Sequence, residues 1–123
     1  KLLGDGKRKV ILYHNEAAFF LENCEKAIEK IERAFDVFGD NSYDTVMLWN
    51  VSEDMLNVVR RVAPELTEGI ERLIQKAEKI GICDISDGSM AVMAAHAYYG
   101  DGCFLSRRCQ LAGKPVMIEN IDV

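Results

Sequence analysis

Two stretches of this chain repeat apolar residues in steps of three and four, and this regularity constrains the fold more than any other feature. The first stretch runs from Ala17 to Phe38 and the second from Leu56 to Ile80. Alternating steps of this size place each apolar set along one side of an α-helix. Because the phase holds over many turns, the helices should pack at shallow crossing angles. We therefore expect a mainly α fold, a compact helical bundle built on two long amphipathic helices.

Residues with cap and stop preferences predict where these helices begin and end. Asn15 is a good N-cap for the first helix, and Gly39 supplies a left-handed stop after Phe38. Ser52 is expected to cap the second helix. Pro64 interrupts the second pattern without changing its phase, so this stretch is either one kinked helix or two abutting helices.

Two apolar runs, 9–13 and 45–51, fit either a strand or a helix. Their β-branched and aromatic residues favour strands. Val10 and His14, however, continue the stepping of the first helix backwards, and we adopt the helical interpretation. The alternative is a β-α-β order in which the two runs form a short strand pair, and the class would then be α+β or α/β.

The last third of the chain is expected to complete the bundle. The segment 90–99 is apolar nearly all round, which is typical of a central helix. A short helix is expected over 103–112, ended by Gly113 and Pro115. The tail 116–123 is half apolar, so it should dock as a strand or an extended arm.

Length, charge and hydropathy limit the classes of function. The 123 residues suit a single domain over 1–123, which we expect to be excised from or processed out of a longer chain, since it begins with Lys1. A net charge of −5 disfavours nucleic acid and anionic membrane surfaces as partners. No apolar run approaches the ~18 residues that span a bilayer, and no signal peptide is recognisable. We expect an intracellular, cytoplasmic protein that binds neither nucleic acid nor membrane.

The four cysteines are expected to be reduced and free of metal, and no cofactor is expected. Cys24 lies on the apolar side of the first predicted helix, where a free cysteine behaves as a small hydrophobe. Cys103 and Cys109 could bridge across a turn of chain. Together with Cys83 and His96 they also offer a Cys₃His set, but no two of these ligands have the close spacing that structural zinc sites use.

Acidic residues recur along the outer side of the first predicted helix, at Glu22, Glu25, Glu29, Glu32 and Asp36. Carboxylates at this spacing can hold divalent metal, and iron sites in helical bundles add a histidine three residues after a Glu. Neither histidine of this chain has a Glu at that position. Because Lys26, Lys30 and Arg33 interleave with the carboxylates, we interpret the stripe as a solvated, salt-bridging face.

Signatures of the well-marked enzyme classes are missing. The sequence contains no Gly-rich phosphate loop followed by Lys, no Gly-x-Ser-x-Gly elbow and no His-Glu-x-x-His helix. Cys103 follows a glycine turn near a predicted helix start, where the helix dipole would lower its pKa. With His96 nearby in sequence, this cysteine is a candidate for Cys–His catalysis.

One short region gathers unlike side chains, namely His96, Tyr98, Tyr99, Asp101, Arg107 and Arg108. Tyrosine and arginine dominate the energetic centres of protein interfaces, and paired arginines suit carboxylate or phosphate. We expect a protein–protein interaction or regulatory module without catalysis of its own, which binds another protein or associates with itself through apolar helix faces. The alternative is a small enzyme or ligand-binding domain that uses the region from His96 to Arg108.

Overall fold

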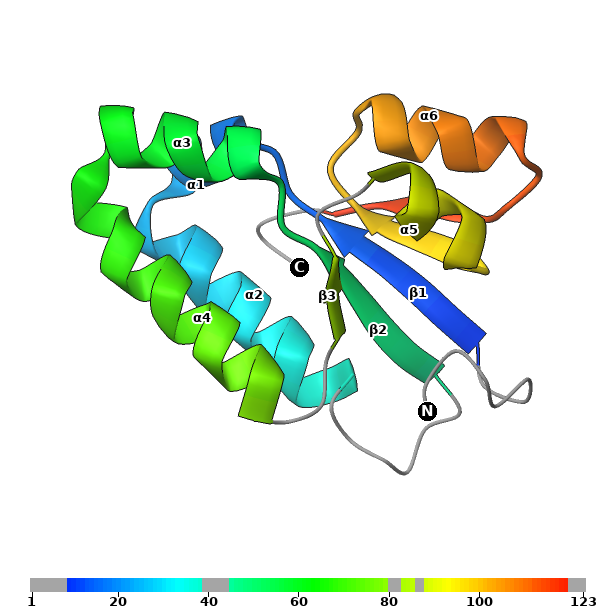
Figure 1. Cartoon of the computed structure of the whole chain (residues 1–123), viewed down its shortest axis with the longest axis horizontal. Helices are drawn as coiled ribbons and strands as arrows, with labels where there is room; N and C mark the ends of the chain where they lie inside the picture. The colour runs from blue at the N-terminus through cyan, green and yellow to red at the C-terminus, as the bar shows by residue number, and fades with distance from the viewer. Residues whose placement is uncertain (1–8, 39–44, 80–82, 86–87, 120–123) are drawn as a thin grey trace.

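A parallel β-sheet forms the centre of the molecule (Figure 1). The computed structural model describes residues 9–38, 45–79, 83–85 and 88–119. Its strands are β1 (Lys9–His14), β2 (Thr45–Asn50), β3 (Cys83–Ile85), β4 (Ala97–Gly100) and β5 (Val116–Ile118). All four strand pairings are parallel, and the five strands lie in the order β3-β2-β1-β4-β5. The expected helical bundle is therefore wrong, and the fold is α/β.

Helices connect the strands and cover both faces of the sheet. They are α1 (Ala17–Asn23), α2 (Glu25–Phe38), α3 (Glu53–Val62), the 3-10 turn η2 (Pro64–Leu66), α4 (Thr67–Lys79), α5 (Gly88–Ala94) and α6 (Phe104–Leu111). Figure 1 shows α2 and α4 on one face of the sheet and α5 and α6 on the other. Helices on both faces, together with this strand order, define a doubly wound fold in which the order reverses between β1 and β4.

Most of the apolar positions predicted for the two helices are confirmed as buried, and they belong to the larger of two hydrophobic cores. Five residues taken from both predicted helices belong to one buried cluster, namely Ile28, Ile31, Leu66, Ile70 and Leu73. Gly69 brings α4 close to α2, since a Cβ at this position would lie 2.5 Å from Cδ1 of Ile28. The sequence therefore predicts correctly which side of each helix is buried, although the helices pack against a sheet instead of forming a bundle.

The first long helix is broken at Cys24. This residue has φ 52°, a left-handed conformation that ends α1 before α2 begins. Its side chain is exposed, so the predicted position of Cys24 on the apolar side is wrong. Glu16 occupies the N-cap position expected for Asn15, without a side-chain cap. The stop predicted at Gly39 lies outside the described residues.

The second long helix consists of two abutting helices, as one of the two predictions proposed. Ser52 caps α3, because its Oγ accepts a hydrogen bond from the Met55 N–H at 3.0 Å. Pro64 begins the 3-10 turn that separates α3 from α4. Proline fits there because the first residues of a helical turn have no intrahelical partner for their N–H groups.

Three segments that were expected to be helical contain strands. The runs 9–13 and 45–51 correspond to β1 and β2, as the alternative proposed, but they lie at the centre of a larger parallel sheet instead of forming an isolated pair, so the class is α/β and not α+β. The segment 90–99 divides between the end of α5 and most of β4. Strands of a parallel sheet are covered on both faces, so they lack the polar alternation that identifies a strand from sequence. The short helix and the extended tail are confirmed as α6 and β5, with 120–123 outside the described residues.

The acidic stripe of the first predicted helix is solvated as predicted. Its five carboxylate residues are not buried, and Lys76 of α4 donates hydrogen bonds to Glu32 at 3.2 Å and to Asp36 at 2.7 Å. Within the described part of the chain, no helix has the length and apolar content needed to cross a membrane.

Replacement of Ile70 by Ala tests the larger core. The side chain is 1 % exposed, so the variant should lose roughly 2 to 5 kcal/mol of unfolding free energy through lost burial and the cavity left behind. Urea denaturation measures this loss. Val62→Ala is the matched control, because Val62 is 61 % exposed and its truncation should change stability little. A loss below about 1 kcal/mol for Ile70→Ala would show that this position is not a core position.

Candidate functional site

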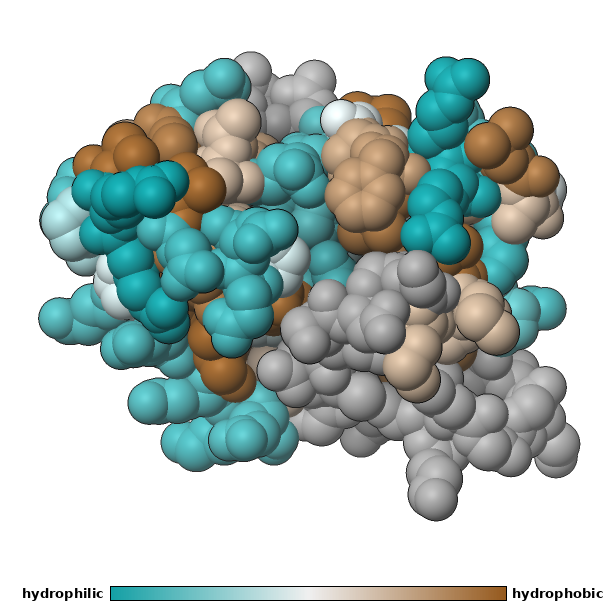
Figure 2. Space-filling model, turned by 45° about the horizontal axis from the view of Figure 1, so that its top comes forward, coloured by the Kyte–Doolittle hydropathy of each residue, from teal (hydrophilic) through white to brown (hydrophobic). Residues whose placement is uncertain are grey.

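The carboxyl ends of β1 and β4 lie side by side at the point where the strand order reverses. β1 pairs with β2 on one side and with β4 on the other. Doubly wound sheets bind ligands just outside these strand ends. Figure 2 turns the top of Figure 1, where the strand ends lie, toward the viewer, and hydrophilic residues there lie beside hydrophobic ones. The residues that follow the strands at this edge are therefore the first candidates for a site.

The backbones of β1 and β4 approach each other very closely at this edge. A Cβ on Gly100, which has φ +143°, would lie 2.0 Å from the carbonyl oxygen of His14. The same carbonyl accepts a hydrogen bond from the Asp101 N–H at 3.0 Å. Only glycine fits at this position, and its absence of a side chain brings the segments after β1 and β4 together.

His14, the last residue of β1, is 2 % exposed and is held at both ring nitrogens. Nδ1 donates to the carbonyl oxygen of Asn50 at 3.4 Å, and Nε2 contacts a carboxylate oxygen of Glu16. Burial lowers the pKa of His14, but hydrogen bonds and charge attraction from Cys103 and Glu16 outweigh it and raise the pKa to about 9. His14 is therefore an imidazolium at neutral pH.

Cys103 lies opposite His14, at the N-cap of α6. Its Sγ accepts a hydrogen bond from the backbone N–H of Ser106, whose Oγ in turn accepts from the Cys103 N–H at 2.9 Å. Burial raises the pKa of the thiol, but the neighbouring His14 and the backbone donors of α6 outweigh it, so the pKa is lowered overall. A helix N-terminus beside a cationic histidine is the environment that favours a thiolate.

Tyr98 and Asp101 hold the loop that carries Cys103. The Tyr98 hydroxyl lies 2.6 Å from the Asp101 carbonyl oxygen and 3.6 Å from Cys103 Sγ. Its single proton is donated to the carbonyl at the shorter distance, so the lowered pKa of Cys103 depends mainly on His14 and on α6. The Asp101 carboxylate accepts the Glu16 N–H at 2.7 Å, which joins this loop to the segment after β1.

A cavity of about 460 Å³ opens beside His14. Glu16 and Asn50 line it at the strand ends, Ser52 lines it at the start of α3, and Phe104 lines it at the start of α6. Its volume lies within the ~300–1,000 Å³ range of small-molecule sites. Cys103 is half-buried and precedes the lining residue Phe104, but it does not itself line the cavity.

Three potential metal ligands also meet here. One ligand atom from each of His14, Glu16 and Cys103 lies within 4.8 Å of the other two. A histidine that binds a metal through one ring nitrogen usually donates the other N–H to a carbonyl or carboxylate, and His14 does so toward Asn50. The set combines imidazole, carboxylate and thiolate, the donor types that Zn²⁺ accepts.

The structure brings together only part of the region predicted from the sequence. Tyr98 and Asp101 belong to the cluster around Cys103. His96 lies at the other end of β4, where its Nδ1 accepts the Val10 N–H at 2.9 Å, so the Cys103–His96 pair considered as a candidate does not form. Cys103 and Cys109 are free thiols, and the bridge considered between them is not made.

The remaining predicted residues lie elsewhere. Tyr99 faces the opposite side of the sheet and stacks on Tyr13 with ring centroids 5.3 Å apart. Arg107 and Arg108 are exposed side chains of α6 and are not members of the cluster. Their role as an interaction surface remains a prediction.

His14, Glu16 and Asn50 were not predicted as site residues. The sequence does contain a signal for His14 and Asn50. Each of them is a polar residue that directly follows an apolar run, 9–13 for His14 and 45–49 for Asn50. This pattern acquires meaning only when the runs are parallel strands, since their carboxyl ends then meet at one edge of the sheet.

Comparison with protein-family models, with curated proteins and with solved structures gives no match for this chain. The class that the geometry defines is a doubly wound α/β domain with a polar, thiol-containing site at its switch point. Functional inference therefore rests on the chemistry of that site.

Replacement of Gly100 by Ala tests whether the close approach of β1 and β4 holds the site together. Steric overlap with the His14 carbonyl and the left-handed φ should together cost roughly 2 to 5 kcal/mol of unfolding free energy. Urea denaturation measures the cost. Gly113→Ala is the control, because its φ of +77° is also strained while a Cβ there meets nothing within 4 Å. Equal losses for the two variants would remove the close approach as the cause.

Proposed function

We propose that this chain is a ligand-binding domain of enzyme type whose site lies between the carboxyl ends of β1 and β4. The observation that supports the proposal is that Cys103 Sγ lies within 4.8 Å of a ring nitrogen of the buried His14 at the switch point of the sheet. A buried histidine and a cysteine with a lowered pKa, placed together, are typical of reactive sites.

The residues would divide the chemistry among them. Cys103 would attack an electrophilic carbon of the ligand as a thiolate, and His14 would donate its proton to the leaving group. Asn50 orients the His14 ring through its carbonyl oxygen. The start of α6 would stabilise negative charge on the thiolate through the Ser106 N–H and the helix dipole.

This proposal belongs to the enzyme or ligand-binding alternative considered from the sequence, with His14 in place of His96. The interaction module expected first remains a prediction. Its structural premise is weaker now, because the apolar helix sides that were to bind a partner pack against the sheet.

Alkylation by iodoacetamide, followed at each cysteine by mass spectrometry, tests the proposal. Because the pKa of Cys103 is lowered, its alkylation rate should stay high at pH values at which an ordinary thiol has become protonated and slow. His14→Gln should remove the cationic partner, raise the pKa of Cys103 and slow its alkylation at pH 7. His96→Gln is the matched control, since His96 bonds to Val10 at the far end of β4.

Two outcomes would contradict the proposal. One is a Cys103 rate profile with the midpoint of an ordinary thiol. The other is an equal effect of His14→Gln and His96→Gln at pH 7. Circular dichroism of both variants establishes that they are folded, so that a rate change reports on the site.

A metal ion at the same residues is the second candidate, favoured by the three ligand atoms that lie within 4.8 Å of one another. Titration with Co²⁺ should then give thiolate-to-cobalt absorption, which Cys103→Ser should abolish. Zn²⁺ should also protect Cys103 from alkylation. A chain that gives neither signal would leave the thiolate function as the sole candidate at this site.

A further inference from the structure

A groove lies on the other face of the sheet, where no helix from the described part of the chain covers β4 and β5. Its floor contains residues of β1, β4 and β5, and its wall is α2. The residues that shape it are Ile11, Ala34, Val37, Ala97, Tyr99 and Met117. Parallel sheets are normally covered on both faces, so an open apolar half-face is the exception. Val37 and Met117, at 54 % and 66 % exposed, show how much apolar surface is left in contact with solvent.

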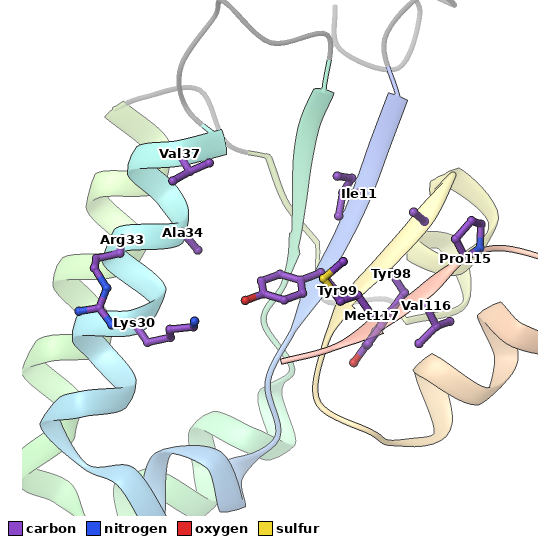
Figure 3. A pocket seen from close by; sticks show the side chains of 11 residues that line it. Ile11, Lys30, Arg33, Ala34, Val37, Tyr98, Tyr99, Pro115, Val116 and Met117 are labelled. Carbon is purple, nitrogen blue, oxygen red and sulfur yellow. The ribbon is translucent and has the colours of Figure 1, made fainter. Parts of the chain in front are cut away.

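One of the charged side chains that line this apolar groove is buried. Lys30 of α2 is only 6 % exposed, and Figure 3 shows it extending toward β4 while the Tyr99 ring extends from β4 toward α2. Among the described residues, Lys30 has neither an ion pair nor a hydrogen bond at its ammonium group. A lysine with so little exposed surface is normally paired with an anion.

Among the described residues that line the groove, none offers Lys30 a counter-charge. The charged residues that line it are Lys30 and Arg33, although the whole chain carries 20 acidic residues against 15 basic ones. The carboxylate of Glu119 does not line the groove, and it accepts hydrogen bonds from Tyr13 at 2.7 Å and from Asn15 at 2.6 Å. An anion supplied by a ligand would give Lys30 the counter-charge that these lining residues do not supply.

We infer that this groove binds a small amphipathic monocarboxylate, a molecule with an acyl or aryl body and one carboxylate group. The carboxylate would pair with the Lys30 ammonium, and the apolar body would lie over Ile11, Ala97 and Met117. A cavity volume of about 560 Å³ suits a molecule of this size better than an extended macromolecular partner. This site is on the opposite face of the sheet from Cys103 and does not depend on the chemistry proposed there.

Isothermal titration calorimetry with four probes tests the inference. Decanoate, below its micelle concentration, should bind roughly tenfold or more tightly than decanol, because a charge-assisted hydrogen bond to Lys30 is added. Decylamine should bind no better than decanol, and acetate should not bind, since it lacks the apolar body. Lys30→Met should reduce decanoate affinity to the level of decanol while leaving decanol unchanged.

Three variants keep the result interpretable. Lys26→Met changes an exposed lysine of the same helix and should leave all affinities unchanged. Ala97→Leu should fill the floor and weaken decanoate and decanol together. Cys103→Ser should leave decanoate binding intact, which separates this site from the one at the carboxyl edge.

Particular results would overturn the inference. Equal affinities for decanoate, decanol and decylamine would show a non-specific apolar surface. Unchanged decanoate binding in Lys30→Met, with thermal unfolding showing that the variant is folded, would place the anion elsewhere. Absence of decanoate binding together with self-association of the chain, measured by light scattering and abolished by Met117→Asp, would identify a protein as the occupant instead.

Discussion

The contact between the backbones of Gly100 and the last residue of β1 is the constraint on which the site depends. Because Gly100 has no side chain, the His14 carbonyl can lie where a Cβ would otherwise be, and the Asp101 N–H can donate to it. The two chain segments that leave the sheet at this point then diverge into α1 and α6. Every polar contact between the segments after β1 and β4 requires this spacing, so a bulkier residue would separate the histidine from the thiol.

Electrostatics at this edge would make the two reactive groups interdependent. Burial alone disfavours both charges, since it lowers the pKa of His14 and raises that of Cys103. The reverse shifts occur because each group stabilises the charge of the other, with Glu16 and the start of α6 contributing on either side. Since the two groups titrate as a coupled pair, removal of one changes the state of the other, and neither keeps its properties in isolation.

The sequence contains enough information to place the helices but not the sheet. Amphipathic stepping identifies α2, α3 and α4 because each buries one side and exposes the other. The strands give no such signal, since most residues of β1 and β2 are buried whichever face they point to, and the alanine-rich run before β4 imitates a central helix. Cys103 was recognised from its glycine turn and helix start. Its partner was missed, because His14 is distant in sequence and reaches Cys103 only through parallel pairing of β1 with β4.

Adjacent tyrosines on β4 show how one short strand serves both faces of the sheet. Successive side chains of a strand point to opposite faces, so Tyr98 packs with α6 and bonds to the Cys103 loop while Tyr99 forms part of the groove beside α2. A shift of one residue in the register with β1 would exchange these environments and would also move Gly100 away from His14. The position of Gly100 therefore fixes the register of β4, and through it the residues that each face presents to a ligand.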